Sequence, residues 1–166
     1  MAHAPRNAAA LRSAGETAFQ LQRYATAQRL LEGAARHSGG GMDTPAKEML
    51  EKSERILALY PAQDLTPGER IRRIMKLRGM AQVRWAACQA KLPADALDDP
   101  ALQQLVEQWK SHSGIKPGGM RDPAVQQEKL KLIYATEVET AQFCGAPGGD
   151  DALVLLMAQS PATVEQ

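Results

Sequence analysis

Four helix starts can be located in this sequence before any other feature is considered, and they constrain the fold most strongly. At each, a residue that caps helices precedes a proline: Thr44-Pro45, Thr66-Pro67, Asp99-Pro100 and Asp122-Pro123. The capping side chain accepts a hydrogen bond from a first-turn backbone N–H, and proline at the first helical position has no N–H to leave unsatisfied. Thr66 and Glu69 also form a capping box. We expect a helix to begin at each of these prolines.

Breaks rich in glycine, proline and aspartate separate segments in which apolar residues recur at helical spacing. No segment has the alternating β-branched pattern that predicts a strand. Hydrophobic residues make up 44% of the chain, charged residues 23% and aromatic residues only 4%, a balance that favours helices. The sequence therefore predicts an all-α fold with seven helices, near residues 5–21, 24–37, 45–60, 67–91, 100–112, 123–143 and 151–159.

The stretch LRSAGETAFQLQRYATAQRLLEGA, residues 11 to 34, reads as two helices with small residues where they would touch. It resembles a tetratricopeptide repeat, a 34-residue helix-turn-helix. Eight positions match: Leu11, Ala14, Gly15, Phe19, Tyr24, Ala27, Leu31 and Ala34. Gly15 and Ala27 would let the two backbones approach, while Tyr24 and Leu31 would fill the seam. The later residues are similar to the tail that follows the repeat in some bacterial tetratricopeptide-containing proteins of unassigned function.

A single helical hairpin cannot bury its own apolar face, so its neighbours must cover it. We expect one domain over residues 1–166, arranged as a compact α-solenoid-like array. Its parts would be a repeat-like hairpin (11–44), a long helical hairpin (45–92), capping helices (93–159) and a tail (160–166).

The resemblance also implies a function, which is to hold a peptide or protein partner on a concave face without chemistry of its own. The first and third helices would line this face, and the candidate residues are first-helix positions that point away from their own partner helix. They are Arg12, Glu16, Gln20 and Arg23. We therefore expect a non-enzymatic, protein-binding scaffold. The alternative is a structural protein that self-assembles through its charges and has no external ligand.

The charge distribution keeps that alternative open. Residues 1–92 hold 15 Lys and Arg against 8 Asp and Glu, a balance of +7, whereas residues 93–166 hold 5 against 11, a balance of −6. Opposed halves attract each other within one fold or head to tail in a homo-oligomer. The other interpretation is two unrelated solvated faces.

The segment 67–91 carries the densest positive charge. On a helical projection five cations share the side opposite its apolar residues: Arg72, Arg73, Lys76, Arg84 and Lys91. This basic face is either simply solvated or meets an acidic segment of a partner or of this chain. No aromatic residues alternate with the cations, so nucleic acid is not an expected partner.

Two charges occupy positions where apolar residues are expected, Arg78 in segment 67–91 and Glu137 in segment 123–143. An unpaired buried charge costs several kcal/mol. We therefore expect the two to form an ion pair across the core, unless Arg78 extends its charged end to solvent.

Two cysteines, Cys88 and Cys144, fall on the apolar sides of the same two segments. They would either form a disulfide or remain as two buried thiols. Their separation matches neither a CxxC motif nor a zinc site, and His3, His37 and His112 are scattered. We expect no metal, no cofactor and no catalytic histidine.

The longest apolar run, residues 152–158, is much shorter than the ~20 residues that a membrane helix needs. The first residues also lack the apolar stretch of a signal peptide. We expect no membrane insertion and a cytoplasmic location, or a periplasmic or extracytoplasmic one if an upstream segment has been removed.

Overall fold

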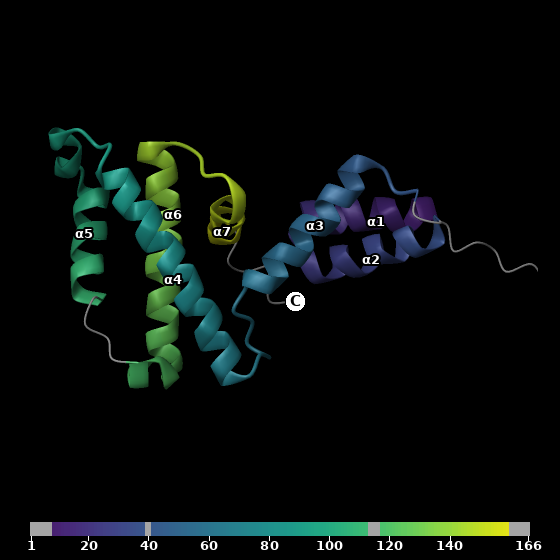
Figure 1. Ribbon diagram of the computed structural model, residues 1–166, viewed down its shortest axis with the longest axis horizontal. Coiled ribbons are helices and arrows are strands. Elements are labelled where there is room, and N and C mark those ends of the chain that lie inside the picture. Colours follow the sequence, from purple (N-terminus) through teal and green to yellow (C-terminus); the bar gives the residue numbers. More distant parts are fainter. Residues whose placement is uncertain (1–7, 39–40, 113–116, 160–166) are drawn as a thin grey trace, which may run out of the picture. The chain divides into compact units, whose positions relative to one another are not determined.

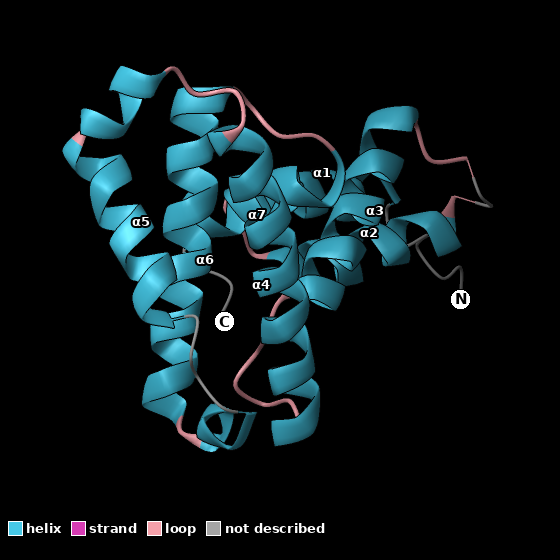
Figure 2. Ribbon diagram, turned by 60° about the vertical axis from the view of Figure 1, so that its left-hand side comes forward, coloured by secondary structure: helices cyan, strands magenta, loops and turns pink. Residues whose placement is uncertain are grey.

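The computed structural model describes residues 8–38, 41–112 and 117–159 and confirms the all-α fold (Figures 1 and 2). These residues form seven α-helices and two short 3-10 helices, and no strand occurs among them. The α-helices are α1 (Ala8–Gln20), α2 (Tyr24–His37), α3 (Thr44–Leu59), α4 (Pro67–Gln89), α5 (Pro100–His112), α6 (Pro123–Cys144) and α7 (Gly149–Gln159). The 3-10 helices are η1 (Ala94–Asp98) and η2 (Pro117–Arg121).

The expected capping residues explain most of these starts. Three accept a hydrogen bond from the first turn of their helix: Thr66 from the N–H of Glu69, Asp99 from that of Ala101, and Asp122 from that of Ala124. At α3 the cap is Asp43, whose Oδ1 accepts from the N–H of Ala46 at 3.0 Å. Helix α3 therefore begins at Thr44, one residue earlier than expected.

The chain divides into two compact units, one up to Tyr60 and the other over Pro61–Gln159. Helix α3 packs on α1 and α2 in the first unit, while α4 packs on α6 in the second. The two helices that we expected to pair over residues 45–92 therefore each pack within a different unit.

The first unit depends on a close approach between α1 and α2. A Cβ added to Gly15 would lie 2.7 Å from Cγ of Leu31, so no larger residue fits without displacement. Ala27 and Leu31 are fully buried and Tyr24 is 2% exposed. The Tyr24 ring also meets Phe19 edge to face, with 5.5 Å between ring centroids. These side chains fill the seam between the two helices, as the sequence predicts.

A Schellman motif ends α1 and allows the short break before α2. The N–H of Arg23 donates to the carbonyl of Ala18 at 2.9 Å, and the N–H of Gln22 donates to the carbonyl of Phe19 at 2.8 Å. Gln22 has a φ of 59°, the left-handed conformation that this motif requires. The chain thus reverses direction within Leu21–Arg23.

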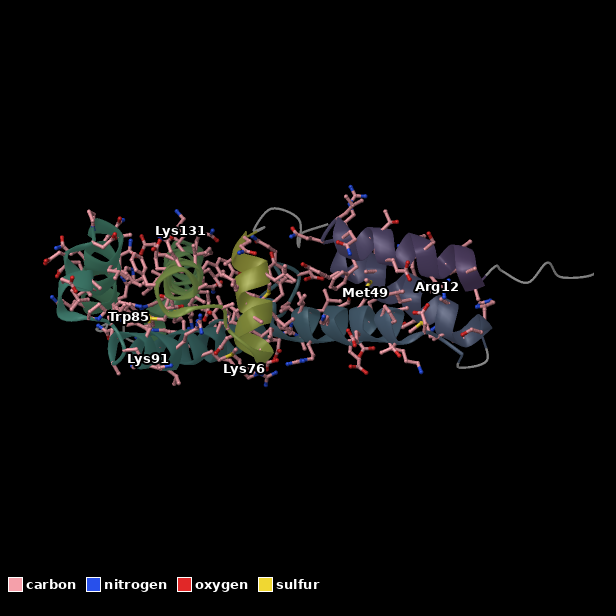
Figure 3. All side chains as sticks on the ribbon, turned by 90° about the horizontal axis from the view of Figure 1, so that it is seen from above. Arg12, Met49, Lys76, Trp85, Lys91 and Lys131 are labelled. Carbon is pink, nitrogen blue, oxygen red and sulfur yellow. A yellow bond between two sulfur atoms is a disulfide. The ribbon has the colours of Figure 1, made fainter. Side chains whose placement is uncertain are left out.

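Helix α6 is the centre of the second unit, because α4, α5, α7 and η2 all pack on it. The apolar core between α4, α5 and α6 contains Trp85, Cys88, Leu102, Leu105 and Leu132. Figure 3 shows Trp85 inside this unit, whereas Lys76 and Lys91 lie on one edge and Lys131 on the opposite edge. Helix α7 covers a further side of α6 and buries Leu153, Val154 and Met157.

Candidate partner-binding face and the charged sites

The four residues expected to bind a partner lie along α1 and the turn after it. Arg12, Glu16 and Gln20 follow one another at four-residue intervals, so they share one side of the helix. Ala18, on another side, is buried. Gln20 and Arg23 are exposed near the turn, while Arg12 and Glu16 are partly exposed nearer the other end. The structure therefore brings Arg12 and Glu16 together, with Gln20 and Arg23 further along.

Arg12 connects α1 to the start of α3. Its Nη1 lies 2.7 Å from Oδ2 of Asp43, and its Nε lies 3.7 Å from Oε1 of Glu16. The other Asp43 oxygen caps α3, so one carboxylate serves both contacts. The side chains of Arg12 and Asp43 are 40% and 46% exposed, and an ion pair this exposed contributes only about 0–1 kcal/mol. The pair therefore fixes geometry more than it adds stability.

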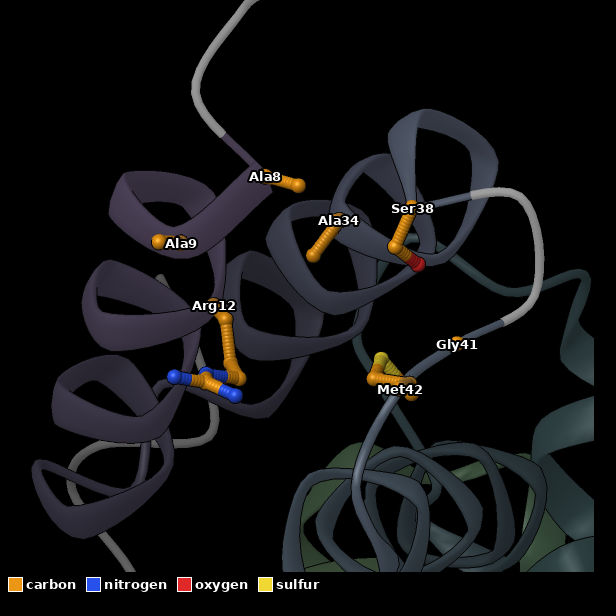
Figure 4. Close-up of a pocket in the computed structure, with 7 residues that line it drawn as sticks. All are labelled: Ala8, Ala9, Arg12, Ala34, Ser38, Gly41 and Met42. Carbon is orange, nitrogen blue, oxygen red and sulfur yellow. The ribbon is translucent and has the colours of Figure 1, made fainter.

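A small hollow of about 100 Å³ lies beside Arg12 (Figure 4). Its wall consists of Ala8, Ala9 and Arg12 from α1, Ala34 and Ser38 from α2, and Gly41 and Met42 from the segment before α3. The three alanines have small side chains and Gly41 has none, which leaves this space open, and Arg12 is the single charged residue in the wall. The hollow is large enough for one small apolar side chain.

The face around the hollow is acidic, since Glu16 and Asp43 oppose one guanidinium. Both carboxylates are partly exposed and can accept further hydrogen bonds from a cation. We call Arg12, Glu16, Asp43 and the hollow the α1–α3 face. This face can hold a cationic group beside a small apolar group.

No protein-family model, curated protein or solved structure matches this chain. In the described ranges, no group of three or more His, Cys, Asp or Glu side chains is placed to hold a metal ion. None of the described helices combines the length and apolar character needed to cross a membrane.

The basic face of α4 is smaller than the sequence predicts. Arg72 is 77% exposed, and Lys76 and Lys91 are exposed as well. Arg73 is only 20% exposed, and its Nε lies 2.8 Å from Oε1 of Glu69, which also pairs with Arg72. The face therefore consists of Arg72, Lys76 and Lys91, with Arg73 at its edge.

Arg84, the fifth expected member, is instead part of a buried polar network. Its side chain is 14% exposed, and its Nε lies 3.1 Å from Oε2 of fully buried Glu137. The same Nε donates to Oγ1 of Thr140 at 2.8 Å, and Nη2 donates to the carbonyl of Gly145 at 2.9 Å. Placing Arg84 on the basic face was therefore wrong, because this side of α4 is covered by α6 and the segment that follows it.

The same contacts show that the predicted ion pair between Arg78 and Glu137 is wrong, because Glu137 pairs with Arg84 instead. Helices α4 and α6 run in the same direction, with Cys88 beside Cys144 and Arg84 beside Thr140 (Figure 1). Arg78 lies six residues before Arg84, roughly 9 Å further down the helix. A helical projection gives the side of a residue but not this offset along the axis.

Burial controls the protonation of Glu137. The pKa of its carboxyl is raised to about 7, chiefly by loss of hydration and also by the negative charge of Asp151. The positive charge of Arg84 acts in the opposite direction. Burial also raises the pKa of Asp151, which lies in the first turn of α7. Arg84 of α4 thus pairs with Glu137 of α6, and its positive charge also lowers the pKa of Asp151 in α7.

Arg78 itself stacks on an aromatic ring. Its guanidinium carbon lies 5.7 Å from the ring centroid of Trp109, which is a cation–π contact. Nearby Lys129 is 2% exposed, and its Nζ donates to the carbonyl of His112 at 2.9 Å. Burial lowers the pKa of Lys129, and the charge of Arg78 lowers it further. Lys129 is not among the residues predicted from the sequence, although its position beside apolar Leu130 and Ile133 could have indicated a buried cation.

Cys88 and Cys144 form a disulfide, the first of the two alternatives left open by the sequence. Their Cα atoms are 5.6 Å apart, and the bond ties the last turn of α4 to the last residue of α6. Arg84 reaches Gly145 directly beside this bond. The disulfide and the Arg84 network therefore hold the same end of the second unit.

A second hollow of about 380 Å³ lies against α5 and α6. It is lined by Gln108, His112, Glu128, Lys131, Leu132 and Ala135. Charges of both signs are present, and they do not converge on a common ligand type. We assign no function to this hollow.

Proposed function

We propose that this protein is a non-enzymatic interaction module that binds a protein or peptide on the α1–α3 face. The observation that carries the proposal is the open hollow lined by Arg12, whose guanidinium pairs with Glu16 and Asp43. The core of the first unit is already filled by Tyr24, Ala27 and Leu31, so neither the hollow nor these exposed charges is needed to complete it.

The likeness of residues 11–34 to a tetratricopeptide repeat supports this proposal. Gly15, Tyr24, Ala27 and Leu31 have the burial that such a repeat requires. Helix α3 packs against both α1 and α2, as the first helix of a following repeat would. Repeats of this kind bind extended or helical segments of other proteins, which is the activity that we propose here.

The composition of the α1–α3 face suggests the ligand. A peptide with a small apolar side chain could fill the hollow, and a neighbouring Lys or Arg could pair with Glu16 and Asp43. Since these contacts are partly solvated, we expect modest affinity, in the micromolar range, about −8 kcal/mol.

A random peptide library displayed on phage tests the proposal. Selection on the full chain should enrich peptides that combine a basic residue with a small apolar one, and Glu16→Lys should abolish their binding. Glu107→Lys, the same charge reversal at a 71% exposed residue of α5 outside this face, is the matched control and should leave binding unchanged. Peptides that bind wild type and Glu16→Lys equally would contradict the proposal.

The disulfide also bears on where the module works. Disulfides persist in oxidising compartments and are rare in reducing cytosol. We therefore propose the periplasmic or extracytoplasmic location over the cytoplasmic one. Alkylation of unreduced cell extracts with a polyethylene glycol maleimide should leave Cys88 and Cys144 unmodified, whereas two added labels would favour the cytoplasm.

A further inference from the structure

Helix α4 has an apolar outer side that its own unit leaves uncovered. Met75 is 44% exposed and Val83 is 72% exposed, the largest value for a large hydrophobic residue in the described chain. Gly79, Ala86 and Ala90 are exposed between and beyond them. These five residues follow one another at intervals of four, four, three and four. Such spacing places them along one line of the helix.

This stripe lies opposite the side that packs on α6. The buried side contains Ile74, Leu77, Ala81, Trp85 and Cys88. No atom lies within 4 Å of a Cβ built on Gly79, so another backbone can approach closely there.

The middle of the outer side carries no exposed charge. Between Gly79 and Gln89 the single charged residue is Arg84, which is buried against Glu137. Soluble helices usually place charged residues on a solvated side. An uncharged stripe with an exposed valine and methionine is instead typical of a helix that meets another helix.

The stripe is symmetric along the helix, and this symmetry identifies the occupant. Its midpoint falls between Gln82 and Val83. If an antiparallel copy of α4 is laid on it about that midpoint, Met75 faces Ala90 and Gly79 faces Ala86. A large residue thus meets a small one at each end, which is the complementarity that a two-fold contact requires.

The charges at the two ends favour the same antiparallel arrangement. The first half of α4 exposes Arg72 and Lys76, whereas residues 93–107 contain four acidic residues and no basic one. Asp95 and Asp98, which follow α4 in η1, are both exposed. In the antiparallel pair Arg72 faces position 93, next to these carboxylates. In this arrangement the positive end of each helix dipole also lies beside the negative end of the other, which is favourable.

We propose that a second copy of this chain docks antiparallel on the stripe Met75, Gly79, Val83, Ala86 and Ala90. The resulting homodimer is independent of the α1–α3 face. One helix pair buries less than the ~1,200–2,000 Å² of a standard interface, so the dimer should dissociate at micromolar concentrations.

Sedimentation equilibrium of the full chain over a concentration series measures this dimer directly. Wild type should shift from monomer to dimer with rising concentration, and Val83→Glu should remain monomeric because it places two like charges at the midpoint. Leu21→Glu, the same kind of change at a 55% exposed residue of the first unit, is the matched control and should dimerise like wild type. A monomer at every concentration, or a dimer indifferent to Val83→Glu, would overturn the proposal.

Two further variants test the antiparallel orientation. Gln82→Cys should form an intermolecular disulfide with its own copy under mild oxidation, whereas Met75→Cys should not. Arg72→Glu should weaken the dimer about tenfold, and adding Asp98→Lys should restore it. In a parallel pair residue 72 would face residue 72 of the other copy, so Arg72→Glu would only exchange one like-charge contact for another. A dimer of unchanged strength, or no recovery with Asp98→Lys, would therefore overturn the antiparallel arrangement. The α1–α3 face shares no residue with this stripe, so the two proposals can fail separately.

Discussion

At the scale of single residues, Gly15 sets the distance between α1 and α2. A Cβ there would lie 2.7 Å from Cγ and 3.3 Å from the backbone nitrogen of Leu31. Overpacking of this kind costs about 1–3 kcal/mol, while the better helix propensity of alanine returns up to about 1 kcal/mol. We expect Gly15→Ala to destabilise the first unit by about 1 kcal/mol.

Urea denaturation followed by far-UV circular dichroism measures this loss. Gly68→Ala is the matched control, because no atom lies within 4 Å of a Cβ at this helical glycine. It should leave stability unchanged or raise it slightly. An unchanged midpoint for Gly15→Ala would mean that the helices move apart without cost.

Arg84 is the second residue whose replacement has a defined consequence, because Glu137 is fully buried beside it. Removing one partner of a buried pair costs about 3–5 kcal/mol when the other charge must stay. We expect Arg84→Met to destabilise the second unit by about 3 kcal/mol at pH 8. The loss should be smaller at pH 5, because there Glu137 can take up a proton.

Tryptophan fluorescence during urea denaturation is the appropriate measurement, since Trp85 and Trp109 both lie in the second unit. The double variant Arg84→Met with Glu137→Met should recover much of the loss, because it leaves no unpaired charge. If the two single losses simply add in the double variant, Arg84 and Glu137 do not interact.

At the scale of elements, the position of Glu137 on α6 makes packing with α4 and α7 depend on pH. Its pKa is raised from 4.5 to about 7 in the folded protein. The folded state therefore binds this proton more tightly than the unfolded state does. The resulting stability is fully present below pH 4.5 and is lost as the pH rises through 7.

We therefore expect the second unit to become less stable between pH 5 and pH 8. The tryptophan-monitored urea midpoint should fall over this range in wild type. Glu137→Gln keeps the shape of the side chain but cannot titrate, so its midpoint should change much less. Parallel slopes for the two proteins would show that another group titrates.

The starts of helices are the features that local sequence predicts best. The capping side chains of Thr66, Asp99 and Asp122 need contacts only within one turn, so their chemistry can be read from neighbouring residues. The contact of Gly15 with Leu31 could also be anticipated, because two helices joined by a short turn must pack together. Such features depend on residues close in sequence.

The choice of packing partners between distant helices could not be predicted in the same way. Arg84 and Arg78 both border the apolar side of α4, and only the offset between α4 and α6 decides which reaches Glu137. That offset depends on contacts 56 residues apart, such as the one between Cys88 and Cys144. Helical periodicity carries no information about it.

At the scale of the whole molecule, the two units differ in what holds them together. The first unit relies on close packing around Leu31 and Ala46, and it contains no cysteine or tryptophan. The second contains the disulfide, the Arg84 network and both tryptophans. One reagent should therefore affect the two units differently.

A reductant that cleaves the disulfide between Cys88 and Cys144 is such a reagent. Cross-linking residues separated by 56 positions should stabilise the fold by about 4 kcal/mol, through the lost entropy of the unfolded chain. With a reductant present, the tryptophan-monitored urea midpoint should therefore fall sharply. The urea midpoint of the first unit, followed by circular dichroism, should not change.

Cys88→Ala supplies the control, because it should match reduced wild type and show no response to the reductant. If wild type is equally insensitive, its two cysteines are thiols before reduction. In that case the location proposed from the disulfide fails as well. Binding at the α1–α3 face and pairing through α4 would stand, since neither depends on a cysteine.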